Sequence, residues 1–224
     1  MLVRLTARTF RNLDALDLRP GPGRHLVVGG NGAGKTSLLE AVYVLATTRS
    51  FRTARIADCA RHDAGGFHLG GEVEDGARVA LEVGWRAAPG ADGGGERLRL
   101  VNGRTPALVE HLAALPVVAW TAAEAEVASG PPALRRRLLD RGVVGTRPPA
   151  LAALQRYRQA LAGKRELLAA GRGTAAEVAS WNALVAESGA EVARLRAAYA
   201  EALAAALAGV EAEAALPFPA ISLA

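Results

Sequence analysis

The chain has 224 residues, half of them hydrophobic, which is enough to bury the core of one large domain or two small ones. Its 27 lysines and arginines outnumber 22 acidic residues, and the formal charge of +5 is compatible with a nucleic-acid partner. The single cysteine, Cys59, excludes an internal disulfide and a cysteine-based zinc site, and the four histidines show no metal-ligand spacing. Because we find no signal peptide and no run of about 18 apolar residues, we expect a cytoplasmic protein that does not span a membrane.

The first part of the chain is predicted to alternate short strands and turns. Strands are expected at residues 1–7 and 16–18, with a turn at 10–13 between them. After a Pro-Gly-Pro-Gly break, an apolar Leu-Val-Val run predicts a third, buried strand at residues 25–28. A glycine-rich loop follows, and leucines and valines at helical spacing then predict a helix at 35–46.

The glycine-rich loop fits the phosphate-loop pattern G-x-x-x-x-G-K-[ST], in the strand–loop–helix context that the motif needs. Its glycines and the positive end of the helix dipole let backbone N–H groups surround an anion. Lys35 is expected to bind the β- and γ-phosphates of ATP, and the Thr36 hydroxyl to bind Mg²⁺. The alternative is a chance turn in a chain with 25 glycines. The predicted nucleotide-binding residues are Gly29, Gly30, Asn31, Gly32, Ala33, Gly34, Lys35 and Thr36, with Ser37 as a further candidate.

The middle of the chain is predicted to continue the sheet. Asp75-Gly76 and Asn102-Gly103 are strong signals for tight turns between strands. The expected elements, in order, are a short helix at 55–61, paired strands at 67–74 and 77–85, a flexible loop at 87–95, a strand at 98–101, a helix at 108–114 and a strand at 117–120.

Beyond residue 130 the sequence is predicted to be helical, with helices at about 132–140, 150–170 and 174–208. Two sets of apolar residues recur at seven-residue spacing, which predicts an antiparallel helical hairpin. An ordinary amphipathic pair in a globular core remains the alternative. The first set is Leu154, Leu161 and Leu168, and the second is Val178, Val185, Val192 and Tyr199.

The order of these motifs resembles a known family. The segments Thr-Phe-Arg-Asn-Leu at 9–13, the phosphate loop, and Ser-Leu-Leu-Glu-Ala-Val-Tyr at 37–43 resemble the head of an SMC-like ATPase. The segments at 48–52, 101–103, 115–118 and 132–141 narrow the resemblance to the RecF family. The resemblance implies an α/β, ABC/SMC-like P-loop ATPase head with a mixed sheet around the phosphate-loop helix, plus an all-α helical-hairpin subdomain.

This resemblance implies a division into a P-loop ATPase subdomain at 1–130, a helical subdomain at 131–219 and the start of a returning strand at 220–224. It implies an ATP- and Mg²⁺-dependent protein of DNA replication and recombinational repair. Such a protein would bind single-stranded or gapped DNA without sequence specificity and support recombinase loading and SOS induction. The full-length protein would form an ATP-dependent homodimer, with recombination-mediator proteins as possible partners.

Two departures from the family pattern affect the expected activity. Residues 121–125 read Thr-Ala-Ala-Glu-Ala where the family usually has Ser-Pro-Glu-Asp-Leu, so Glu124 is the remaining acid there. The family's signature segment and acidic Walker B strand would lie beyond Ala224, so the chain resembles an N-terminal portion. We find no catalytic residue and expect ATP binding without efficient hydrolysis. A P-loop kinase or another NTPase acting on a small molecule is the alternative function, and a non-catalytic nucleotide-binding fragment is a third.

Several arginines have two interpretations. Arg11 and Asn12 occupy positions where SMC-like heads place residues near the nucleotide, although both also suit a turn-stabilising role. Some arginines are candidates for contacts with DNA phosphates. The alternatives are that they lie on a solvated face, form an intramolecular ion pair or contact a second subunit. These candidates are Arg49, Arg52, Arg135, Arg136 and Arg137.

Overall fold

The computed structural model of the chain describes residues 1–88, 94–171 and 173–214, so the strand predicted at 220–224 lies outside the described residues. The chain divides into two compact units, Met1–Trp120 and Thr121–Ala224. No helix in the described ranges is long and apolar enough to cross a membrane.

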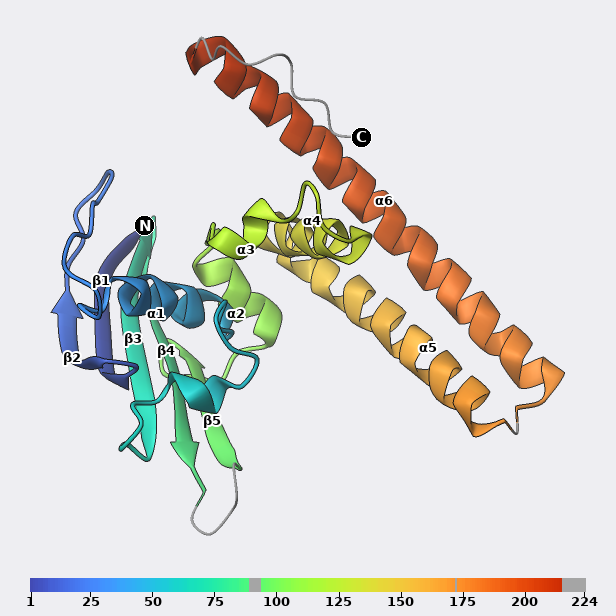
Figure 1. Ribbon diagram of the computed structural model, residues 1–224, viewed down its shortest axis with the longest axis horizontal. Helices are drawn as coiled ribbons and strands as arrows, with labels where there is room; N and C mark the ends of the chain where they lie inside the picture. The colour runs from blue at the N-terminus through green and yellow to red at the C-terminus, as the bar shows by residue number, and fades with distance from the viewer. Residues whose placement is uncertain (89–93, 172, 215–224) are drawn as a thin grey trace. The chain divides into compact units, whose positions relative to one another are not determined.

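The first unit contains a five-stranded antiparallel sheet with the strand order β2-β1-β3-β4-β5. Helix α1 lies across one face of this sheet (Figure 1). The elements of the unit are β1 (Leu2–Phe10), β2 (Leu13–Leu18), α1 (Lys35–Thr47), the 3₁₀ helix η1 (Ile56–Cys59), β3 (Gly66–Asp75), β4 (Ala77–Ala87), β5 (Gly95–Val101) and α2 (Leu108–Ala114).

The two faces of the sheet follow from the alternation of apolar and polar residues along its strands. In β1, Leu5 and Ala7 are buried against the helices, whereas Arg4 on the opposite face is ion-paired with Asp17 at 2.7 Å. Gly71 of β3 explains the close approach of α1, because a Cβ atom there would lie 2.4 Å from Leu45 Cδ2. The buried face therefore fixes the position of the helix that carries the phosphate loop.

Both tight turns predicted from sequence are present. Gly76, with φ of 70°, closes the β3–β4 hairpin, and Asn102 and Gly103 have φ of 50° and 75° after β5. Helix α2 has the predicted bounds. Near Arg55, the predicted helix is only the four-residue η1.

Two predicted strands are wrong. Residues 25–28 and 117–120 belong to no strand, and except for Val117, which packs against the core, their large apolar side chains are exposed. Leu26 is 88% exposed and Trp120 is 71% exposed. A strand needs a neighbour to take its backbone hydrogen bonds. Among the described residues, the sheet pairs β1 to β5 with one another and leaves these two segments without a partner strand.

The second unit is helical, as predicted. It contains α3 (Ala122–Ala125), α4 (Pro132–Thr146), η2 (Pro148–Ala150), α5 (Leu151–Ala170) and α6 (Ala175–Ala214). Helix α4 continues past the predicted end near residue 140 to Thr146. Gly142 allows its close packing on α6, because a Cβ atom there would lie 2.1 Å from the Tyr199 ring.

Helices α5 and α6 form the predicted antiparallel hairpin (Figure 1). Val192 and Leu154 of the two heptad sets are buried, and Trp181 packs over Gly163 of α5. Leu168 is instead 55% exposed. A straight α-helix drifts by about 20° per heptad, so the third residue of a short seam turns away from the partner helix.

Candidate nucleotide-binding site

The predicted phosphate loop leads directly into α1. Gly32 and Gly34 have φ of 81° and 92°, the left-handed region that glycine adopts without strain. Helix α1 begins at Lys35, so its first N–H groups and the positive end of its dipole lie at the loop. This arrangement suits a phosphate group, and the exposed Thr36 hydroxyl is accessible for Mg²⁺.

Lys35 closes the loop on itself. Its Nζ donates hydrogen bonds to the carbonyl oxygens of Gly29 and Gly30, both at 2.7 Å. These bonds keep the ammonium at the loop, within reach of the place where phosphates would bind.

Asn12 and Ser37, both predicted as candidates, meet at this loop. Asn12 Nδ2 donates to the Gly32 carbonyl at 2.6 Å, and Ser37 Oγ donates to Asn12 Oδ1 at 2.7 Å. The β1–β2 turn is therefore bonded both to the phosphate loop and to the first turn of α1.

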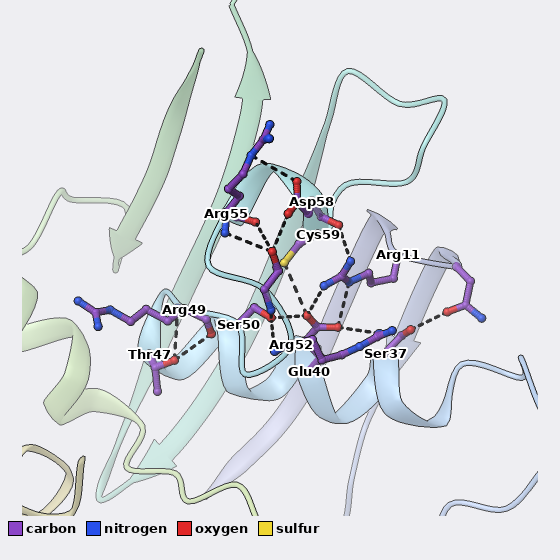
Figure 2. Close-up of polar contacts among 12 residues, drawn as sticks. Arg11, Ser37, Glu40, Thr47, Arg49, Ser50, Arg52, Arg55, Asp58 and Cys59 are labelled. Carbon is purple, nitrogen blue, oxygen red and sulfur yellow. Dashed lines mark hydrogen bonds and ion pairs between the residues drawn. The ribbon is translucent and has the colours of Figure 1, made fainter. Parts of the chain in front are cut away.

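A buried carboxylate lies one turn further along α1 (Figure 2). Glu40 is fully buried and accepts two hydrogen bonds from Arg11, from Nε at 3.0 Å and from Nη2 at 2.7 Å. Ser50 Oγ donates to it at 2.5 Å, and Arg52 Nη1 donates at 3.1 Å. The Cys59 thiol lies 3.8 Å from the same carboxylate. We call these five side chains the Glu40 cluster.

The electrostatics of the Glu40 cluster follow from this geometry. Burial alone would raise the pKa of Glu40, but hydrogen bonds from Arg11 and Ser50 outweigh it and hold the pKa below its usual range. The hydrogen bonds between Arg11 and Glu40 raise the pKa of Arg11 in turn. Burial, together with the Glu40 charge, raises the pKa of Cys59 to about 11, so the thiol stays protonated at neutral pH.

The predicted arginines fall into different surroundings. All the guanidinium nitrogens of Arg11 are bonded within the protein, since Nη1 donates to the Asp58 carbonyl at 2.5 Å in addition to the bonds to Glu40. Arg52 is also bonded to Glu40, whereas the Arg49 side chain points away from the cluster (Figure 2). The segment between them is held by Phe51, whose ring packs against Tyr43.

In the second unit, Arg135 donates to the carbonyl of Gly130 at 3.0 Å, while Arg136 and Arg137 are exposed. Glu124 receives a hydrogen bond from the Thr121 backbone N–H at 2.9 Å and pairs with Arg141 at 2.7 Å. The acid that remains in the altered segment thus caps a short helix.

Sequence reasoning missed Glu40 and Ser50. A signal for Glu40 was present, because Ser37, Ala41 and Val44 mark the buried stripe of α1 and Glu40 lies on that stripe. A carboxylate on an apolar stripe requires a cationic partner when it is buried. The partners themselves come from segments that only the fold brings together.

Comparison with known proteins finds similar sequences under one protein name. RecF of Chromohalobacter salexigens is 39% identical over 180 residues, which cover 80% of this chain and 49% of that protein. RecF of Myxococcus xanthus is 34% identical over 206 residues, which cover 89% of this chain and 52% of that protein. The chain thus spans about half the length of the curated relatives it matches. No protein-family model matches it.

Solved structures give the same picture. Two structures of the recombination mediator protein RecF in the RecFOR pathway, RecF-ATPrS and RecF-ATP, superpose with TM-scores of 0.84 and 0.83 at 26% identity. Each match covers 95% of this chain and 57% of the RecF chain. A structure from work on SMC ATPases matches 62% of this chain with a TM-score of 0.50 at 18% identity, which supports the fold alone.

The chain therefore has the fold of an SMC-like ATPase head, as the sequence predicted. Within that class, the chain matches the N-terminal portion of RecF, the DNA replication and repair protein.

Proposed function

We propose that the chain binds ATP and Mg²⁺ as the N-terminal portion of a RecF-type ATPase of DNA replication and recombinational repair. The observation that carries this proposal is the phosphate loop at the N-terminus of α1, with Lys35 bonded to the loop carbonyls and Thr36 exposed. The likeness to RecF-ATP supports the choice of nucleotide.

We expect ATP binding to exceed hydrolysis in this chain by a wide margin. Hydrolysis needs a carboxylate that orients the attacking water and charge that stabilises the departing phosphoryl group. The acid that α1 provides, Glu40, is buried and saturated by arginine and serine donors, so it is unsuited to that task. In the proposed full-length homodimer, other segments and a second subunit would supply these groups.

Replacement of Lys35 tests the nucleotide site. Lys35→Ala should abolish measurable ATP binding in a calorimetric titration, because it removes the charge that faces the phosphates, while the circular dichroism spectrum stays unchanged. The other lysine of the chain, Lys164 on α5, provides the matched control: Lys164→Ala should bind ATP like the wild type. Equal ATP affinity in the two variants would refute the phosphate-loop assignment.

DNA is the second proposed ligand, in single-stranded or gapped form. The excess of basic residues supports this, and Arg49, Arg136 and Arg137 are better placed for DNA phosphates than Arg11 or Arg52, whose guanidinium groups bind Glu40. A role in recombinase loading, in SOS induction and with mediator proteins would follow from the same family relationship.

The salt dependence of binding tests the DNA proposal. Affinity for an oligonucleotide of arbitrary sequence should fall steeply between low and moderate salt, because each neutralised phosphate releases counterions. The change should be similar for unrelated sequences. Affinity that does not respond to salt, or DNA that fails to bind at low salt, would favour the alternative of a small-molecule NTPase.

A further inference from the structure

The turn between β1 and β2 lies against the phosphate loop and contributes one side chain to it. Asn12 donates to the carbonyl of Gly32 at 2.6 Å and accepts from Ser37 Oγ at 2.7 Å. The first partner belongs to the loop and the second to the first turn of α1. A single neutral side chain therefore ties the loop to the helix that follows it.

The direction of the Gly32 carbonyl matters for anion binding. In a trans peptide, the C=O group and the following N–H group point in opposite directions. With its carbonyl held toward Asn12, Gly32 directs the Ala33 N–H to the other side, where it makes only a long 3.3 Å contact with the Gly30 carbonyl. The Gly29 and Gly30 carbonyls, by contrast, accept from the Lys35 ammonium. An N–H group that lies opposite a held carbonyl can contribute to an anion-binding concavity.

Asn12 and Lys35 differ in what happens when phosphate binds. The ammonium of Lys35 is expected at the phosphates, so we expect ATP to compete with the two carbonyls for it. Asn12 carries no charge and its two partners are protein groups, so its bonds do not compete with the phosphates. We propose that Asn12 is a positioning residue that fixes Gly32, and through it the loop N–H groups, both before and during ATP binding. This inference rests on the proposed function, because it takes the loop to be a phosphate site.

Hydrogen bonds and packing hold the β1–β2 turn, which contains Asn12, in place. Arg11 adopts φ of 55°, a left-handed conformation that is uncommon for a residue with a side chain. Its two hydrogen bonds to Glu40 and the bond from its backbone N–H to the Cys59 carbonyl, at 2.8 Å, hold this conformation. On the other side, a Cβ atom at Gly34 would lie 3.0 Å from Leu13 Cδ2, so the turn packs directly on the loop.

A pair of asparagines allows a matched test. Asn102 also has a left-handed φ of 50°, and its Oδ1 accepts from the Ala80 N–H at 2.8 Å, but it lies in the turn after β5. Asn12→Ala and Asn102→Ala thus remove the same chemical group from two turns, one at the phosphate loop and one away from it. ATP affinity, thermal unfolding and amide hydrogen exchange at residues 30–34 without nucleotide would be measured for both, in the full chain.

Asn12→Ala should weaken ATP binding roughly fivefold, as expected when the bond that positions Gly32 is lost, and should speed exchange of the loop amides before any ATP is added. Asn102→Ala should lower thermal stability without changing either property. Asn12→Asp keeps the acceptor for Ser37 but loses the donor to Gly32, so its loop amides should exchange like those of Asn12→Ala.

Two outcomes would overturn the proposal. Unchanged loop exchange in Asn12→Ala with weakened ATP binding would make Asn12 a direct nucleotide ligand. Wild-type exchange in both Asn12 variants would show that the bond to Gly32 does not hold the loop. If the wild-type chain itself binds no ATP, the proposed function fails, whereas the exchange comparison still tests the positioning of the loop.

Discussion

Each unit contains a buried or nearly buried carboxylate that binds two arginines, and the two cases differ in what they join. Glu40 in the first unit pairs with Arg11 and Arg52. Asp140 in the second unit pairs with Arg158 at 3.2 Å and with Arg196 at 2.8 Å. Asp140 connects α4, α5 and α6, three helices that also share apolar and aromatic contacts.

Glu40 connects less regular parts of the chain. Its partners lie in the β1–β2 turn and in the segment 48–55 that follows α1, both outside regular secondary structure. Turns and loops have few backbone hydrogen bonds of their own, so charged side chains contribute more to fixing their conformation. A carboxylate bound by two arginines thus has two different roles. In the first unit Glu40 holds the turn and loop segments beside the candidate site, and in the second Asp140 reinforces the packing of helices.

The largest expected effect is that of Glu40→Ala. It leaves Arg11, with a side chain only 19% exposed, without its carboxylate, and it frees the turn that carries Asn12. Loss of one partner from a buried ion pair costs about 3 kcal/mol of unfolding free energy. Urea denaturation should show this loss, and ATP affinity measured under folding conditions should fall as well.

Asp140→Ala is the control for this comparison. The Arg158 side chain is 54% exposed, so water can solvate it after the substitution, but Arg196 is only 20% exposed and loses its carboxylate as Arg11 does, so the expected loss is about 2 kcal/mol. ATP affinity should not change. If Asp140→Ala lowers ATP affinity as much as Glu40→Ala does, the distinction between the two carboxylates is wrong.

Lowering the pH should have a smaller effect on stability, through Glu40 and His111 of the first unit. The lowered pKa of Glu40 contributes stability above its ordinary value of 4.5, and this is lost as the pH falls through the folded-state pKa. Burial also lowers the pKa of His111, so below about pH 6.5 the unfolded chain binds a proton that the folded chain resists. Both groups therefore make the chain less stable in acid.

Thermal unfolding measured from pH 7 to about pH 2 would separate the two contributions. His111→Leu should flatten the upper part of the profile, because His111 is buried and its Nε2 lies 2.7 Å from the Leu45 carbonyl. Glu40→Ala should flatten the lower part. A wild-type profile in either variant would exclude the corresponding group as a source of the acid sensitivity.

Local sequence predicted local structure well. The phosphate loop, the Asp75-Gly76 hairpin and helix α2 depend on residues within a few positions of one another, and all of them formed. The segments 25–28 and 117–120 have the apolar composition of strands, but a strand depends on a distant neighbour that composition does not reveal.

The candidate site shows the same limit. Lys35 and the glycines could be identified from a contiguous motif. The bond from Asn12 to Gly32 spans 20 positions and that from Arg11 to Glu40 spans 29, so these contacts exist only because β1 and α1 pack together. Sequence reasoning missed Glu40, and nothing local to it shows which cations reach it.

The exposed indole of Trp120 has a spectroscopic consequence. The chain has three tryptophans, and Trp85 and Trp181 are partly buried, whereas Trp120 is largely open to solvent. An indole in water emits at longer wavelength and is more readily quenched by acrylamide than one packed among side chains. Trp120 fluorescence can therefore report on binding at this segment. Any polypeptide that covers residues 117–120 would shift the Trp120 emission toward the blue and shield the indole from acrylamide.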